Sequence, residues 1–150
     1  MKVIFLDFDG VITSYNSRWT LMPVKMNYVA RICAETGAKI VISSSWRQSS
    51  LESTLKDITN PEAPYVEDKP DTLSNFTIDV TPRLDCNKYG RGDEIQWWLD
   101  RHPEVTNYVI IDDDTFDMLP NQMPHVVESS WEDGISKEMV DHAIEILNAH

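Results

Sequence analysis

Short, continuous runs of apolar residues recur along the chain. They are rich in Val and Ile, and we expect them to form strands that are covered on both faces of a sheet. The runs occupy residues 2–8, 38–43, 107–111 and, more weakly, 125–128. A further segment, residues 76–80, alternates apolar with polar residues and predicts one exposed strand.

Segments with apolar residues at helical spacing separate these runs. We expect helices over residues 24–37, 49–58, 93–102 and 136–149. Gly37 is a candidate left-handed cap for the first helix, and Pro103 ends the third. Buried strands that alternate with helices predict an α/β fold in which a mostly parallel sheet lies between helices. A length of 150 residues predicts a single domain over 1–150.

Polar and charged side chains stand directly after three of the predicted strands. Ligands of parallel α/β sheets bind outside the carboxyl ends of the strands, so we expect these side chains to meet there. They are Asp7 and Asp9 after the first run, Ser43, Ser44, Ser45 and Arg47 after the second, and Asp112, Asp113, Asp114 and Asp117 after the third. So many acids in one crevice would repel one another unless a cation lay among them.

Composition and charge exclude several classes of function. The net charge of −12 repels polyanions, which disfavours non-specific binding to duplex nucleic acid. No apolar run is long enough to cross a bilayer and no cleavable secretion signal is evident, which predicts a cytoplasmic protein. Cys33, Cys86 and the histidines lack the spacing of metal ligands. An oxygen-only site favours a hard cation such as Mg²⁺, which shares its coordination with phosphate oxygens, and this points to phosphate chemistry.

Four segments resemble, in the same order, the motifs of the haloacid dehalogenase-like (HAD) phosphohydrolases. They are "FLDFDGV", "VISSS", the Arg91 segment "GRGDEI", and "VIIDDDTFD". Within that superfamily, "SSSWR", "RGDEI" and "IDDD" look most similar to the phosphatase domains of RNA-repair proteins and of phage polynucleotide kinase–phosphatases. The resemblance implies a Rossmann-like, HAD-like fold and a Mg²⁺-dependent phosphatase.

The resemblance also implies the catalytic residues. Asp7 would be the nucleophile that forms an aspartyl-phosphate, and Asp9 would protonate the leaving oxygen and then deprotonate the water. Two positions apart on an extended strand, both carboxylates are expected on the same side of the site. The second aspartate favours hydrolysis of a phosphate ester, because dehalogenases lack it.

The remaining roles leave alternatives open. Ser43, or Ser44 if the strand ends later, would hydrogen-bond the phosphoryl oxygens. Arg91, with Lys88 as the alternative, would neutralise their charge. The expected metal ligands are Asp7, Asp9 through its main-chain carbonyl, Asp113 as the first choice for a direct ligand, and Asp112 as a second ligand or a group that holds a water. Asp114 could simply cap the following turn.

The site is expected to be an open crevice, which suits a large substrate. The first interval between motifs is mostly one predicted helix, and the second has hardly enough residues for a folded cap, although residues 59–90 could form a small flap. Arg47 could reach a second phosphate and Trp46 could stack on a base, which favours a nucleotide or a nucleic-acid end. One alternative substrate is a small metabolite, in which case a neighbouring subunit of an oligomer would close the site. Another is a phosphoprotein. A catalytically silent phosphate-binding module on the same fold is a further alternative.

Overall fold

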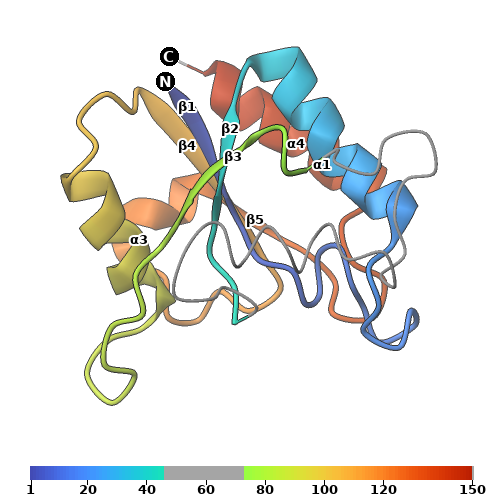
Figure 1. Ribbon diagram of the computed structural model, residues 1–150, viewed down its shortest axis with the longest axis horizontal. Coiled ribbons are helices and arrows are strands. Elements are labelled where there is room, and N and C mark those ends of the chain that lie inside the picture. Colours follow the sequence, from blue (N-terminus) through green and yellow to red (C-terminus); the bar gives the residue numbers. More distant parts are fainter. Residues whose placement is uncertain (46–72, 150) are drawn as a thin grey trace.

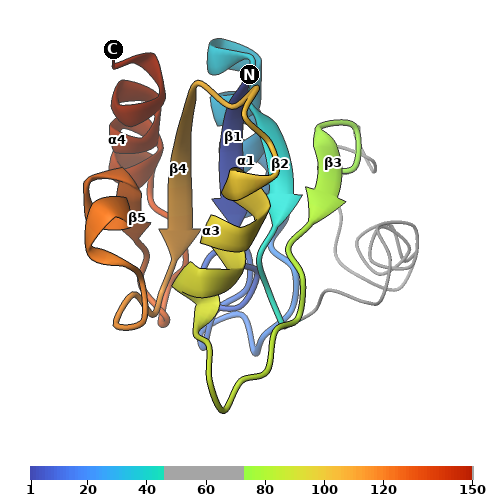
Figure 2. The same ribbon diagram turned by 90° about the vertical axis from the view of Figure 1, so that its left-hand side faces the viewer.

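The computed structural model describes residues 1–45 and 73–149. Five strands form one parallel sheet in the order β3-β2-β1-β4-β5 (Figures 1 and 2). The strands are β1 (Lys2–Leu6), β2 (Lys39–Ile42), β3 (Thr77–Val80), β4 (Asn107–Asp112) and β5 (Val126–Glu128). Within the described residues, this confirms the predicted α/β fold of the HAD-like, Rossmann-like type without a large cap. The predicted helix 49–58 lies outside the described residues.

Helices cover both faces of the sheet. They are α1 (Pro23–Thr36) and α4 (Lys137–Asn148) on one face, α3 (Arg91–Asp100) on the other, and a short 3-10 helix, η1 (Pro120–His125), before β5. Alternate residues of β1 face opposite ways, so that Leu6 packs in the larger core with α1 and α4, and Phe5 packs against Trp98 of α3. Both faces of β1 are therefore apolar, which explains its continuous apolar run.

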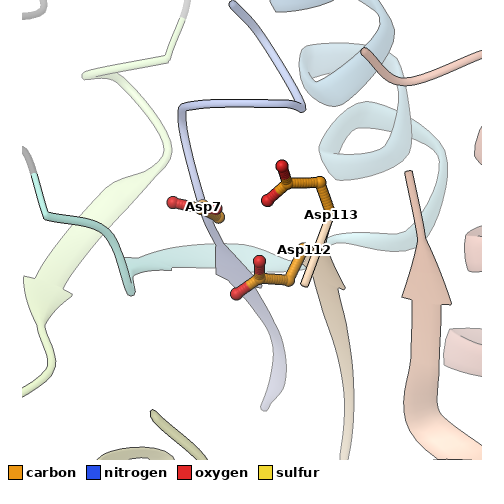
Figure 3. Close-up of side chains that lie close together, drawn as sticks. All are labelled: Asp7, Asp112 and Asp113. Atoms are coloured by element: carbon orange, nitrogen blue, oxygen red, sulfur yellow. The ribbon is translucent and has the colours of Figure 1, made fainter. Parts of the chain in front are cut away.

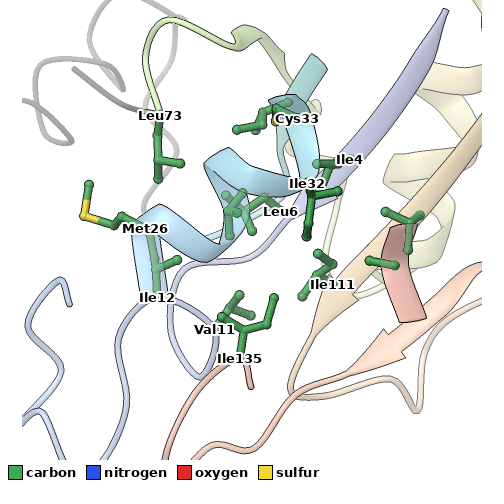
Figure 4. Close-up of a cluster of buried hydrophobic side chains, with 14 of the residues drawn as sticks. Ile4, Leu6, Val11, Ile12, Met26, Ile32, Cys33, Leu73, Ile111 and Ile135 are labelled. Carbon is green, nitrogen blue, oxygen red and sulfur yellow. The ribbon is translucent and has the colours of Figure 1, made fainter. Parts of the chain in front are cut away.

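The larger core lies between the sheet and helices α1 and α4 (Figure 4). Helix α1 buries Met26 and Ile32, whereas Val24, the first apolar residue of the predicted helix, is exposed. Gly37 ends α1 in the left-handed conformation, with φ of 77°, and its N–H donates to the Cys33 carbonyl, as its position after the helix predicted.

Strand β3 is an edge strand with an irregular register. Ile40 of β2 pairs with Thr77, and Val41 pairs with Asp79, so Ile78 is an extra residue in β3. Thr77 is consequently buried while Ile78 is 38% exposed. The alternating pattern at 76–80 predicted an exposed strand, and the bulge explains why its central apolar residue faces solvent.

Helix α3 starts earlier than its apolar pattern predicted. Its first residue is Arg91, not Asp93, and its N-cap is Gly90. Asp93 accepts a hydrogen bond from the N–H of Gly90, which closes the first turn. Arg91 therefore belongs to the helix instead of preceding it.

Candidate active site

Three carboxylates meet at the carboxyl edge of the sheet. Asp7 follows β1, Asp112 ends the neighbouring strand β4, and Asp113 comes next, and each offers an oxygen within 4.8 Å of the others (Figure 3). Asp7 and Asp112 are buried, and Asp113 is partly buried. The N-terminus and the end of α4 lie at the opposite edge of the sheet (Figure 2). The convergence follows from two adjacent parallel strands that end at the same level.

Local hydrogen bonds hold two of the three carboxylates, those of Asp7 and Asp112, in place. The N–H of Asp7 donates to the Ile111 carbonyl at 3.0 Å, which extends the pairing of β1 with β4 by one residue. The side chain of Asp7 accepts from the N–H of Phe8 at 2.8 Å, and that of Asp112 accepts from the N–H of Asp114 at 3.1 Å. These bonds fix the Asp7 and Asp112 carboxylates before any ligand binds.

A glycine makes room for Asp113. Gly10 has φ of 81°, a conformation that favours glycine, and a Cβ atom at this position would overlap the Asp113 carboxylate. The buried hydroxyl of Ser129 donates to the Gly10 carbonyl and holds this turn against the segment after β5. Sequence reasoning named Asp113 but missed the glycine that allows its approach, although the "DFDGV" spacing carries that signal.

The Asp9 carboxylate is held by a turn and is not one of the three gathered carboxylates. Strand β1 ends at Leu6, and the chain turns after Asp7, with the N–H groups of Ile12 and Thr13 donating to the Phe8 carbonyl. The argument from an extended strand therefore does not apply beyond Asp7. The Asp9 carboxylate accepts a hydrogen bond from the Thr13 hydroxyl at 2.8 Å. Its carboxylate is not part of the three-acid group found in the described residues.

Arg91 connects the ends of three strands. Its Nη1 atom lies 3.2 Å from a carboxylate oxygen of Asp7 and 3.2 Å from one of Asp112, and it donates to the Ser43 carbonyl at 2.8 Å. Lys88, the alternative cation, lies in the turn before α3 and lines a groove next to Arg91. The geometry thus places Arg91 among the carboxylates.

The first turn of α3 is held by a residue that the sequence did not assign. The Asp117 carboxylate accepts a hydrogen bond from the N–H of Arg91 at 2.9 Å. A Cβ atom at Gly90 would lie 2.9 Å from the Asp117 side chain, and one at Gly92 would lie 2.8 Å from its carbonyl oxygen. Two glycines around Arg91 therefore let the loop after β4 approach the helix and position its first residue.

The serines after β2 differ in their surroundings. Ser43 and Ser44 are buried, whereas Ser45 is exposed. The Ser43 side-chain oxygen has no hydrogen-bond partner among the described residues, although Ser43 is only 1% exposed. A buried hydroxyl without a partner is rare in folded proteins, and a ligand, an ion or a water can supply the missing partner. Trp46 and Arg47, the predicted contacts for substrate, lie outside the described residues.

The carboxylates are short of positive charge. Burial raises the pKa of Asp7, and Arg91 opposes that rise. Burial and the Asp7 charge together raise the pKa of Asp112 to about 9, again against Arg91. Burial lowers the pKa of Arg91, but Asp7 and Asp112 outweigh it and the pKa is raised. Arg91 thus contacts two of the three gathered acids, and an all-oxygen donor set in need of charge compensation fits Mg²⁺.

A family model matches residues 3–140, and its description is "HAD domain in Swiss Army Knife RNA repair proteins". The chain matches no curated protein and no solved structure. Within the described part of the chain, every helix is too short or too polar to cross a membrane.

Proposed function

The chain belongs to the family of HAD domains found in Swiss Army Knife RNA repair proteins, and from this premise we propose that it hydrolyses a terminal phosphomonoester of a nucleotide or nucleic acid. The family implies a phosphatase-type hydrolase that acts on a phosphorylated substrate. The observation that carries the proposal is the buried Ser43 hydroxyl, which has no hydrogen-bond partner among the described residues. The Ser43 carbonyl accepts a hydrogen bond from Arg91, and the same guanidinium contacts Asp7 and Asp112. A phosphoryl group would supply the acceptor that this hydroxyl lacks.

Asp7 is the nucleophile in this proposal. Its carboxylate oxygen attacks phosphorus, an aspartyl-phosphate bond forms, and the bond from phosphorus to the ester oxygen breaks. Asp9 gives its proton to the departing oxygen. Water then attacks phosphorus, Asp9 takes a proton from that water, and the bond to Asp7 breaks, which releases phosphate and restores both aspartates.

Ser43 and Arg91 stabilise the charge on the phosphoryl oxygens in both steps. The hydroxyl donates to one oxygen, and the guanidinium, already held by the Ser43 carbonyl, neutralises developing charge without a large movement. Asp7, Asp112 and Asp113, with the main-chain carbonyl of Asp9, would hold Mg²⁺. When bound, that ion screens the repulsion between the carboxylates and the phosphate.

A screen of phosphate release tests the proposal. Candidate substrates are nucleotides, sugar phosphates, phosphopeptides and oligonucleotides with a 3′- or 5′-phosphate, each with Mg²⁺ and with a chelator. We expect Mg²⁺-dependent release, with nucleotides or oligonucleotides preferred. Asp7→Asn keeps the shape of the side chain, so turnover should fall by several orders of magnitude while the melting temperature changes little. Undiminished turnover in Asp7→Asn would refute the mechanism, and a sugar phosphate as the best substrate would refute the nucleic-acid assignment.

A further inference from the structure

A groove of about 670 Å³ opens directly beside Arg91. Its walls are the segment that joins β3 to α3, residues 81–90, and the loop that follows β4. The first of these extends beyond the carboxyl edge of the sheet, on the same side as the carboxylates (Figure 2). Arg91 lines the groove and also contacts Asp7, so the groove lies next to the position that a phosphate at Asp7 would occupy.

The lining of the groove is unusually basic for this chain. It includes Arg83, Lys88 and Arg91, three of the thirteen lysines and arginines, but only two of the twenty-five acids. Those acids, Glu94 and Asp117, accept hydrogen bonds from the N–H groups of Leu84 and Arg91. A chain of net charge −12 thus has a groove at its candidate site whose lining carries one net positive charge. Arg91 is shared with Asp7 and Asp112, so Arg83 and Lys88 are the lining cations that would meet a further phosphate of the substrate.

Two exposed aromatic residues line the same groove. Phe116 is 85% exposed and Tyr89 is 50% exposed. They come from different segments, Phe116 from the loop after β4 and Tyr89 from the turn before α3. Proteins that bind single-stranded nucleic acid combine solvent-exposed aromatic rings with nearby cations. The bases stack on the rings and the phosphate backbone lies beside the cations.

We infer that this groove binds the nucleoside next to the terminal phosphate of a single-stranded oligonucleotide, with the base against Phe116 and Tyr89 and the next phosphodiester beside Lys88 and Arg83. This inference rests on the proposed function and specifies its substrate as a strand end instead of a free nucleotide or small ester. Single strands fit better than duplexes because stacking on a ring requires an unpaired base. The net negative charge outside the groove likewise keeps a long duplex away.

A cysteine in the groove allows binding to be measured without turnover. Cys86 is exposed and lines the groove, whereas Cys33 is buried and its pKa is raised to about 12 by burial. A thiol reagent should therefore label Cys86 first. In the Asp7→Asn protein with Mg²⁺, we expect 3′- or 5′-phosphorylated pentanucleotides to slow labelling of Cys86. Inorganic phosphate, a sugar phosphate and a phosphopeptide should not slow it.

Substitutions in the groove test which side chains bind the strand. Loss of one stacked base costs about 5- to 150-fold in affinity, so Phe116→Ala should weaken pentanucleotide binding by at least about fivefold. Phe116→Tyr keeps the ring and should restore binding. Lys88→Ala should weaken binding and reduce its salt dependence, whereas Lys2→Ala removes the same charge at the opposite edge of the sheet and should have neither effect. For both groove variants, KM should rise more for the pentanucleotide than for a small chromogenic phosphate.

The outcomes separate the two proposals. If phosphate release requires Asp7 and Mg²⁺ but pentanucleotides leave Cys86 labelling unchanged, the groove assignment is wrong and the phosphatase stands. The groove assignment would also be wrong if a phosphopeptide protected Cys86 from labelling, or if the groove variants raised KM equally for the pentanucleotide and the chromogenic phosphate. A failure of Phe116→Tyr to restore binding would overturn it as well. If Asp7→Asn retains full turnover, the proposed function fails, whatever the labelling shows.

Discussion

At the scale of single residues, a substitution of Ser43 should affect stability and catalysis in different ways. Its hydroxyl is buried without a partner in the described structure, which costs about 1–3 kcal/mol in a folded protein. Ser43→Ala removes that cost, so the melting temperature of the ligand-free protein should stay the same or rise. Phosphatase turnover should fall about 10- to 1000-fold, because one hydrogen bond to the phosphoryl group is lost.

A matched control for Ser43 is available on β3. The hydroxyl of Thr77 is also buried, but it donates to the Leu73 carbonyl at 2.7 Å. Thr77→Val should therefore lower the melting temperature and leave the turnover of folded protein unchanged. Thermal unfolding and phosphate release measured on both variants check the pair. A lower melting temperature in Ser43→Ala would mean that its hydroxyl already has a structural role.

Asp112 should make the stability of the metal-free protein depend on pH. Its pKa is raised to about 9 in the folded state, against about 3.9 in an unfolded chain. A carboxyl group whose pKa is raised by folding stabilises the fold fully at a pH below its pKa in the unfolded chain. This stabilisation is lost as the pH rises toward its pKa in the folded protein. With chelator present, the free energy of unfolding should contain a component that falls from about pH 4 to pH 9, by up to about 1.4 kcal/mol per pH unit.

Asp112→Asn tests this dependence, because an amide cannot titrate and its oxygen can still accept from the N–H of Asp114. Denaturant unfolding of both proteins across that pH range gives the comparison. The variant should show a flatter profile than the wild-type protein. Parallel profiles would show that the Asp112 pKa is not raised in the folded protein.

At the scale of elements, the start of α3 holds the strand ends together. Arg91 is largely buried between Asp7 and Asp112, so Arg91→Met leaves two buried acids without their cation. We expect the metal-free protein to lose on the order of 3 kcal/mol of unfolding free energy, and Mg²⁺ to raise its melting temperature by more than in the wild-type protein. Thermal unfolding with Mg²⁺ and with chelator measures both effects.

The other end of the same helix provides the control. Arg101 is exposed, and its guanidinium lies over the Trp97 ring at 3.7 Å. Arg101→Met should cost less than about 1 kcal/mol and leave the response to Mg²⁺ unchanged. Equal losses in the two variants would mean that Arg91 acts through the helix and not through the carboxylates.

At the scale of the whole molecule, Mg²⁺ should stabilise the fold by mass action. An ion that binds only the folded protein adds about 2.7 kcal/mol at a hundred times its dissociation constant. The melting temperature should therefore rise with Mg²⁺, and Asp113→Ala should weaken the rise because it removes one of three gathered carboxylates. Asp114→Ala removes an exposed acid outside that group and should keep the full response. An undiminished response in Asp113→Ala would leave Asp112, the last residue of β4, as the principal ligand from this part of the chain.

The sequence by itself determined the sheet and the place of the site. Apolar runs such as residues 2–6 are local patterns, and a strand covered on both faces requires them. The parallel connection then brings Asp7 and Asp112 to the same edge, whatever the details of packing. Both conclusions depend only on near neighbours in the chain and on a general rule of topology.

Only the tertiary structure decided which side chains meet within that edge. The turn after Asp7 brings the Asp9 carboxylate within hydrogen-bonding distance of the Thr13 hydroxyl. Asp117 and the two glycines beside Arg91 determine where α3 begins. The unpartnered Ser43 hydroxyl and the groove with Phe116 likewise depend on segments far apart in the sequence. Local periodicity carries no information about such contacts, because they depend on how loops pack against one another once the core has formed.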